Sequence, residues 1–153
     1  VRTIQGMFNM CLEKSSLVNL SGLENWDTRN IISMREVFYE CKSLRDITAL
    51  KNWNTKNVTK MNYMFQHCES FLSLSVLENL DISNVQSLEG MFNGCRSLKN
   101  ITALKNWNTK NIIYMHNMFN ECSSLSSLNG LENWDTNNVK DMRKMFCQCK
   151  KII

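Results

Sequence analysis

This sequence lacks most of the features that point to catalysis or to nucleic-acid binding. It contains no proline, five glycines and two histidines, and its formal net charge is +4. It has no glycine-rich phosphate loop and no Ser-His-Asp arrangement, and His67 and His116 have no evident partner. A charge this small, without aromatic side chains placed to stack bases, argues against nucleic acid as a partner. We therefore expect no enzyme, no catalytic residue and no cofactor.

Long apolar runs are missing as well. No stretch approaches the ~20 apolar residues that a membrane-spanning helix needs, and no signal peptide or lipidation motif is visible. Neither end carries the polar cap that a stack of repeats requires. Since the chain opens on Val1 in mid-repeat, we expect a segment of a longer repeat array, or a subunit that docks through its ends.

What the sequence does contain is a repeat built around Phe-x-x-Cys. From the second pair onward the pairs recur at one constant interval, and only the first gap, from Phe8 to Phe38, is longer. A constant period in this range is typical of a solenoid, in which each repeat stacks on its neighbours. The pairs are Phe8/Cys11, Phe38/Cys41, Phe65/Cys68, Phe92/Cys95, Phe119/Cys122 and Phe146/Cys149.

The columns that stay constant from repeat to repeat predict the interior of the stack. Besides the phenylalanines and cysteines, a tryptophan column is formed by Trp26, Trp53, Trp107 and Trp134. Leu80 replaces tryptophan at the middle place of this column. A further column is formed by Asn30, Asn57, Asn84, Asn111 and Asn138. We expect these asparagines to point inward and to hydrogen-bond the backbone of their own loop and of the next coil.

Two apolar patterns alternate inside each repeat and predict its elements. The spacing of Leu98, Ile101 and Leu104 resembles the strand segment of leucine-rich repeats. The steps from Ile112 through Met115 and Met118 to Cys122 suit a short helix or helical turn. The predicted fold is one α/β leucine-rich-repeat solenoid over residues 1–153. It would have about five and a half 27-residue coils, with a parallel sheet on one face and short helices or helical turns on the other.

Acidic and basic residues alternate along one variable column, which makes it a candidate surface. This column reads Glu24, Lys51, Glu78, Lys105, Glu132. Opposite charges about 4.8 Å apart in stacked coils attract one another weakly, although duplication of a two-repeat block explains the alternation equally well. A thin basic stripe of Arg29, Lys56 and Lys110 completes the candidate surface.

The cysteine column is expected to be structural. Its side chains should run parallel rather than toward each other, so we predict free thiols and no disulfides between repeats. A one-dimensional column does not supply the converging ligands of a metal site. Cys147 stands outside the column, and the pair it forms with Cys149 is a poor metal signature.

The repeat as a whole resembles a known family. Asn-Trp-Asp-Thr-x-Asn-Val/Ile-x-x-Met-x-x-Met-Phe-x-x-Cys-x-Ser-Leu is similar to the repeat of BspA-like leucine-rich repeat surface proteins, and most of all to the mycoplasma-type domain of unknown function. The resemblance covers essentially the whole chain. It implies a leucine-rich solenoid, in which the segment at Ile112 and Met115 can instead form a second short strand.

For function, the resemblance implies surface display, adhesion to host or matrix proteins, and contact between proteins. We therefore expect a non-enzymatic protein-interaction module at the cell surface or outside the cell. The alternative is an assembly component, such as a virus-particle or filament subunit, that docks end to end on copies of itself or on a neighbouring subunit.

Overall fold

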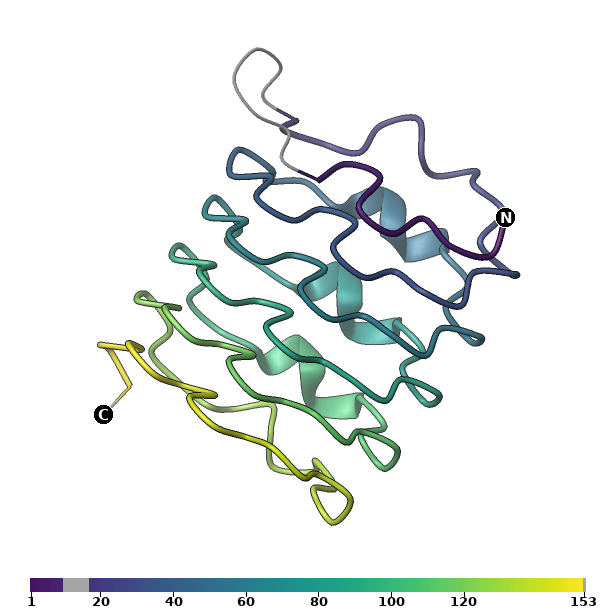
Figure 1. Ribbon diagram of the computed structural model, residues 1–153. Helices are drawn as coiled ribbons and strands as arrows, with labels where there is room; N and C mark the ends of the chain where they lie inside the picture. Colours follow the sequence, from purple (N-terminus) through teal and green to yellow (C-terminus); the bar gives the residue numbers. More distant parts are fainter. Residues whose placement is uncertain (10–16, 153) are drawn as a thin grey trace.

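The chain winds into a stack of coils, with the two termini at opposite ends (Figure 1). This computed structural model describes residues 1–9 and 17–152. Cys11 therefore lies outside the described residues, as does Ile153 at the C-terminal end. Neighbouring coils are joined by isolated parallel β-bridges, one residue per coil along the main column, at Thr3–Ser33, Ser33–Lys60, Lys60–Ser87, Ser87–Tyr114 and Tyr114–Asp141.

Three short 3₁₀-helices lie one beside another along one side of the stack (Figure 1). They are η1 (Thr48–Asn52), η2 (Ser75–Asn79) and η3 (Thr102–Asn106). Each buries a leucine at its centre, and its C-cap is the next residue, a member of the tryptophan column: Trp53, Leu80 and Trp107. A 3₁₀-helix has three residues per turn. The threefold spacing of Leu98, Ile101 and Leu104 matches that period better than the twofold period of a strand.

The prediction of an α/β leucine-rich-repeat solenoid, with a parallel sheet on one face and short helices or helical turns on the other, is therefore wrong. Within residues 1–9 and 17–152 the structure contains no strand and no α-helix, only the bridges and the three 3₁₀-helices. The backbone angles explain why. Two places in each coil have a positive φ, occupied first by Glu36, Tyr63, Gly90, Asn117 and Lys144, and then by Glu40, His67, Gly94, Glu121 and Gln148. A left-handed residue continues neither a helix nor a strand.

The coils nevertheless bond to each other through their backbones. In the segment after each bridge, alternate amides donate to carbonyls of the next coil: Met34 N to Lys60 O at 2.9 Å, Phe38 N to Met64 O at 2.9 Å and Glu40 N to Gln66 O at 2.7 Å. The same pattern recurs from Leu88 N to Tyr114 O at 2.9 Å and onward. The buried backbone is thus satisfied between coils instead of within an element.

The core is a column of stacked rings. Neighbouring phenylalanine rings from Phe8 to Phe146 lie with centroids 5.5–5.9 Å apart and planes within 11° of parallel. Such pairs contribute about 0.5–1.5 kcal/mol each beyond the burial of their area. Repetition of one side chain at one place in every coil therefore holds neighbouring coils in register.

Candidate functional site

The predicted ladder residues lie in or beside the core, and their polar atoms bond to the neighbouring coil. Each described thiol of the cysteine column donates to the carbonyl of the phenylalanine in the preceding coil: Cys95 Sγ to Phe65 O at 3.3 Å, Cys122 Sγ to Phe92 O at 3.2 Å. Cys41, Cys68 and Cys149 make the same bond, at 3.0–3.2 Å. Burial raises the pKa of the Cys95 and Cys122 thiols, which disfavours the reactive thiolate.

The asparagine column does not lie where it was predicted. Its side chains are exposed at an edge of the stack instead of pointing inward. They do bond between coils, because each amide donates to a carbonyl of the preceding coil: Asn57 to Arg29 O, Asn84 to Lys56 O, Asn111 to Ser83 O and Asn138 to Lys110 O, at 2.7–2.8 Å. The buried polar column is formed by Thr28, Thr55 and Thr109, whose hydroxyls donate to Asn54 O, Asp81 O and Asp135 O.

The alternating charges of the candidate surface do not pair. Among the described residues, no ion pair joins members of the Glu24, Lys51, Glu78, Lys105, Glu132 column. Glu24 and Glu132 instead accept the backbone amides of Gly22 and Gly130, each at 2.7 Å. The ion pairs between coils that involve arginine are at Arg96, which reaches Glu69 at 3.2 Å and Glu121 at 2.9 Å.

The basic stripe belongs to turns that hold themselves together. Asp27 accepts both the side chain of Arg29, at 2.8 and 2.9 Å, and its backbone amide at 3.1 Å. These bonds lower the pKa of Asp27 to about 2. Asn54 and Asn108 accept the backbone amides of Lys56 and Lys110 in the same way, at 3.1 and 3.3 Å. The stripe therefore follows from a repeated Asx-turn.

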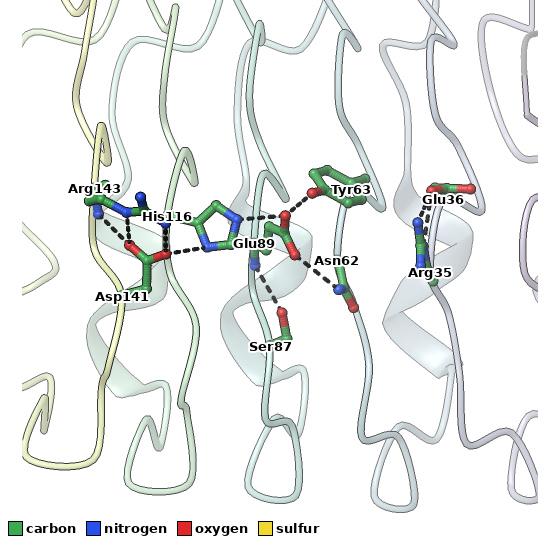
Figure 2. Close-up of polar contacts among 9 residues, drawn as sticks. All are labelled: Arg35, Glu36, Asn62, Tyr63, Ser87, Glu89, His116, Asp141 and Arg143. Atoms are coloured by element: carbon green, nitrogen blue, oxygen red, sulfur yellow. Dashed lines mark hydrogen bonds and ion pairs between the residues drawn. The ribbon is translucent and has the colours of Figure 1, made fainter.

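Unlike polar side chains meet in a different column, which the sequence analysis did not find. Arg35, Asn62, Glu89, His116 and Arg143 follow each other one repeat apart, two positions after the residues of the main bridge column. We call these five residues the polar column. Figure 2 shows Asn62, Glu89 and His116 reaching toward one another from successive coils, while Arg143 binds Asp141 and Arg35 binds Glu36 within their own coils. The expectation that His116 has no partner is therefore wrong, and the one-repeat spacing of Glu89 and His116 was the available signal in the sequence.

Glu89 is the centre of the polar column. Its Oε1 lies 2.6 Å from His116 Nε2 and also accepts the hydroxyl of Tyr63, while its Oε2 accepts Asn62 Nδ2 at 3.4 Å. Both Glu89 and His116 have side chains that are only 21% exposed. Three coils therefore hold one carboxylate in place (Figure 2).

Asp141, a residue of the main bridge column, lies on the other side of His116 from Glu89. It lies 3.4 Å from His116 Nδ1, which is buried and forms no hydrogen bond within the described part of the chain. Arg143 binds both carboxylate oxygens of Asp141, at 3.0 and 2.7 Å, and these bonds hold the pKa of Asp141 far below its usual range. His116 therefore stands between two carboxylates.

Gly90 makes room for this arrangement. It has a φ of +58°, and a Cβ at this position would overlap Cδ1 of Tyr63. Because the side chain is missing, the Tyr63 ring lies over the next coil and its hydroxyl reaches Glu89. Gly94 leaves space for the His67 ring in the same way, since a Cβ there would overlap Nδ1 of that ring.

Shallow grooves flank the polar column. One of about 480 Å³ is lined by Asn9, Glu36, Tyr39, Tyr63 and Gln66, and one of about 210 Å³ by His116, Asn117, Arg143 and Lys144. Across residues 1–9 and 17–152, no three His, Cys, Asp or Glu side chains are grouped so that they could hold a metal ion. In the same residues no helix has the length and apolar character to cross a membrane.

Comparison with known proteins identifies the family. The family model described as "Mycoplasma protein of unknown function, DUF285" matches residues 2–101 and 72–152, which together span almost the whole chain. The chain belongs to this family. The mycoplasma-type part of the predicted resemblance is thereby confirmed, whereas the resemblance to BspA-like surface proteins stays a prediction.

The comparisons with curated proteins and with solved structures add little to this family assignment. No curated protein matches the sequence. Among solved structures, internalin C2 from Listeria monocytogenes is 13% identical over 82% of this chain and 75% of its own, with a TM-score of 0.25. That likeness is too slight to indicate a shared fold.

Proposed function

We propose that this chain is a non-enzymatic protein-interaction module that binds a protein partner through the face carrying the polar column. The observation that carries the proposal is the contrast between columns. Inner columns repeat one residue type from coil to coil, whereas the polar column places unlike side chains together on the outside. A binding surface needs such variety, while a stacking core needs uniformity.

The geometry of this face suits recognition. Hydrogen bonds hold Tyr63, Glu89 and His116 in place before any partner arrives, and the ion pair with Arg143 holds Asp141, which lowers the entropy lost on binding. Large apolar side chains lie exposed in the neighbouring columns, with Ile32 45%, Tyr114 44% and Met142 42% exposed. Interfaces are enriched in tyrosine, methionine and arginine.

The resemblance to BspA-like surface proteins supports a partner outside the cell. On this proposal the chain is displayed at a cell surface or on a virus particle, and it binds a host or matrix protein. The face offers arginines and carboxylates side by side, so the partner would carry charges of both signs at its contact.

A charge-reversal pair tests the proposal. Arg143→Glu changes the polar column, while Lys105→Glu changes an exposed residue of η3 on the side of the 3₁₀-helices. Binding of the whole chain to a panel of immobilised extracellular-matrix proteins would be measured by surface plasmon resonance. Arg143→Glu should weaken any observed binding by about tenfold or more, as at a central interface arginine, and Lys105→Glu by less than about twofold. Equal losses in the two variants would contradict the assignment of the face.

A second candidate function is assembly through the ends of the stack. Phe146 and Trp134, in the last described coil, are only partly buried, whereas the inner phenylalanine rings are fully buried. A further stacked ring could cover them. Sedimentation velocity over a range of concentrations tests this: chains that stack end to end should form species larger than a monomer, and Phe146→Ser should shift them toward the monomer.

A further inference from the structure

His116 lies between two carboxylates that come from different coils (Figure 2). Its Nε2 lies 2.6 Å from Oε1 of Glu89 in the preceding coil, and its Nδ1 lies 3.4 Å from Oδ2 of Asp141 in the next coil. The Nδ1 atom is buried and forms no hydrogen bond with any residue that the structure describes. Both nitrogens of the ring therefore face acceptors.

A neutral imidazole cannot bond to both carboxylates. It carries one N–H, and its other nitrogen is an acceptor. With the proton on Nε2, the lone pair of Nδ1 would face Asp141. With the proton on Nδ1, the lone pair of Nε2 would lie 2.6 Å from an oxygen of Glu89. Two acceptors do not approach so closely without a proton between them, so only a ring with a proton on each nitrogen fits both neighbours.

The second proton does not belong to either carboxyl group. Glu89 accepts the hydroxyl of Tyr63 and the side-chain amide of Asn62. Asp141 accepts two bonds from the side chain of Arg143, at 3.0 and 2.7 Å. Hydrogen bonds to an ionised carboxylate favour that form, and those from Arg143 hold the pKa of Asp141 far below its usual range. The imidazole is therefore the group that carries the proton.

Two cations also stand beside the ring, since Arg143 and Lys144 line the same hollow as His116. The guanidinium of Arg143 is paired with Asp141. The side chain of Lys144 is exposed, so solvent screens its charge. The imidazole is only 21% exposed, and its attraction to the two adjacent carboxylates is screened less. These carboxylates therefore decide which form of the ring is favoured.

We infer that His116 is a pH-dependent clasp, which joins three successive coils when both of its ring nitrogens are protonated. In this state one N–H donates to Glu89 and the other to Asp141. When the ring releases one proton to solvent, one of the two bonds is lost and a lone pair faces a carboxylate. The clasp goes beyond the binding function proposed above and does not depend on it, because it consists of contacts within the chain alone.

The direction of the pH effect follows from this arrangement. The folded chain favours the doubly protonated ring, whereas the imidazole of the unfolded chain loses its second proton at about pH 6.5. The stabilisation is therefore fully present below that pH, and it is lost as the pH rises and the folded chain also releases the proton. Since the clasp lies in the polar column, a rising pH loosens three coils at that face.

Ring ¹⁵N spectra of the whole chain, recorded from roughly pH 5 to pH 9, test the inference. His67 is the internal reference, because no carboxylate lies within ion-pair distance of its ring in the described part of the chain. His116 should keep the nearly equal nitrogen shifts of a doubly protonated ring to a higher pH than His67. Asp141→Asn removes one carboxylate and should bring the transition of His116 toward that of His67. A His116 ring that loses its second proton at the same pH as His67, or at a lower pH, would overturn the inference.

Two glutamine variants form a matched pair for stability. His116→Gln removes the clasp, so its loss in Tm relative to the native chain should be larger at about pH 5.5 than at about pH 8.5, by about 2–4 °C. His67→Gln removes a ring without a carboxylate partner, so its loss should be equal at both pH values. A loss for His116→Gln that does not change with pH, or that is larger at the higher pH, would contradict the clasp. If this variant does not fold, the spectra of the native chain decide the question.

Discussion

Gly22 and Gly130 occupy the same place in two copies of the segment Gly-Leu-Glu-Asn-Trp-Asp-Thr, yet their surroundings differ. Both have a positive φ, +96° and +110°. A Cβ built on Gly22 meets nothing within 4 Å, whereas one on Gly130 would lie 2.5 Å from Ile101 O and 2.9 Å from Thr102 Cα. A side chain at Gly130 would therefore overlap the backbone of the preceding coil. Two residues at the same place in identical segments thus tolerate a side chain differently, because their neighbours in the stack differ.

This difference predicts unequal costs for one substitution. Gly22→Ala should lower the free energy of unfolding by about 1–3 kcal/mol, because alanine is strained at a positive φ. Gly130→Ala should lose about 1–3 kcal/mol more, the usual cost of overpacking. Urea denaturation of both variants measures the two losses. Equal losses would show that the preceding coil does not press on Gly130.

The Asx-turn at Asp27 predicts a pH effect at the scale of one residue. Because its pKa is lowered to about 2 by bonds from Arg29, the folded chain binds this proton less readily than the unfolded chain. The stabilisation is therefore present above the ordinary carboxyl pKa, near 4, and is lost as the pH falls toward 2. NMR titration of the carboxyl should show this value in the native chain and a higher one in Arg29→Ala. A carboxyl that titrates identically in both would contradict the role of Arg29.

At the scale of the element, the left-handed positions decide what each coil can be. They interrupt the segment that was predicted to be a helix, twice in every coil, and only some of them are glycine. Glu36, Tyr63 and Lys144 adopt φ values of +57° to +58° although side chains disfavour this region. Hydrogen bonds to the neighbouring coils must therefore outweigh the local cost. The result is a coil of turns that is stable only when stacked.

Glycine substitution measures the conformational cost of a positive φ at a single residue. Lys144 has a φ of +57°, so Lys144→Gly should raise the free energy of unfolding by about 0.5–1 kcal/mol. Lys140 is in the same coil without a positive φ, and Lys140→Gly should lower it by about 0.5–1 kcal/mol. Both side chains are exposed. Thermal and urea unfolding compare the two variants, and effects of the same sign would refute the strain argument.

At the scale of the whole molecule, one narrow core runs through all the coils. Residues such as Met34, Met61, Phe92 and Met115 are completely buried, and the stacked rings connect every coil to its neighbours. Contacts of this kind couple adjacent coils, so inner coils are supported on two sides and outer coils on one. Access to the interior thus requires the separation of coils.

The rate of thiol labelling measures how often neighbouring coils separate. Cys147 is exposed, whereas Cys95 and Cys122 are buried with pKa values raised by burial. A maleimide should therefore modify Cys147 first and reach the other two only when coils open. Mass spectrometry after timed pulses gives the rates, with urea-unfolded protein as the reference. Labelling of Cys122 as fast as Cys147 in the native protein would contradict a closed stack.

The sequence by itself determined which residues lie at equivalent places in the coils. The constant period of the repeat indicated which phenylalanines, tryptophans and cysteines share a column, because stacking selects one side chain at each inner place. The same period also places Glu89 and His116 one repeat apart, so the contact between them could have been predicted by aligning the variable positions of the repeats as well as the constant ones.

Tertiary structure alone decided how the backbone passes between those places. Glu36, Tyr63 and Lys144 are not residue types that signal a left-handed conformation, since its cost is offset by bonds to neighbouring coils that are distant in the sequence. The exposure of the asparagines depends on the same distant contacts. Local sequence preferences contain no information about them, which is why the predicted sheet and helices were wrong.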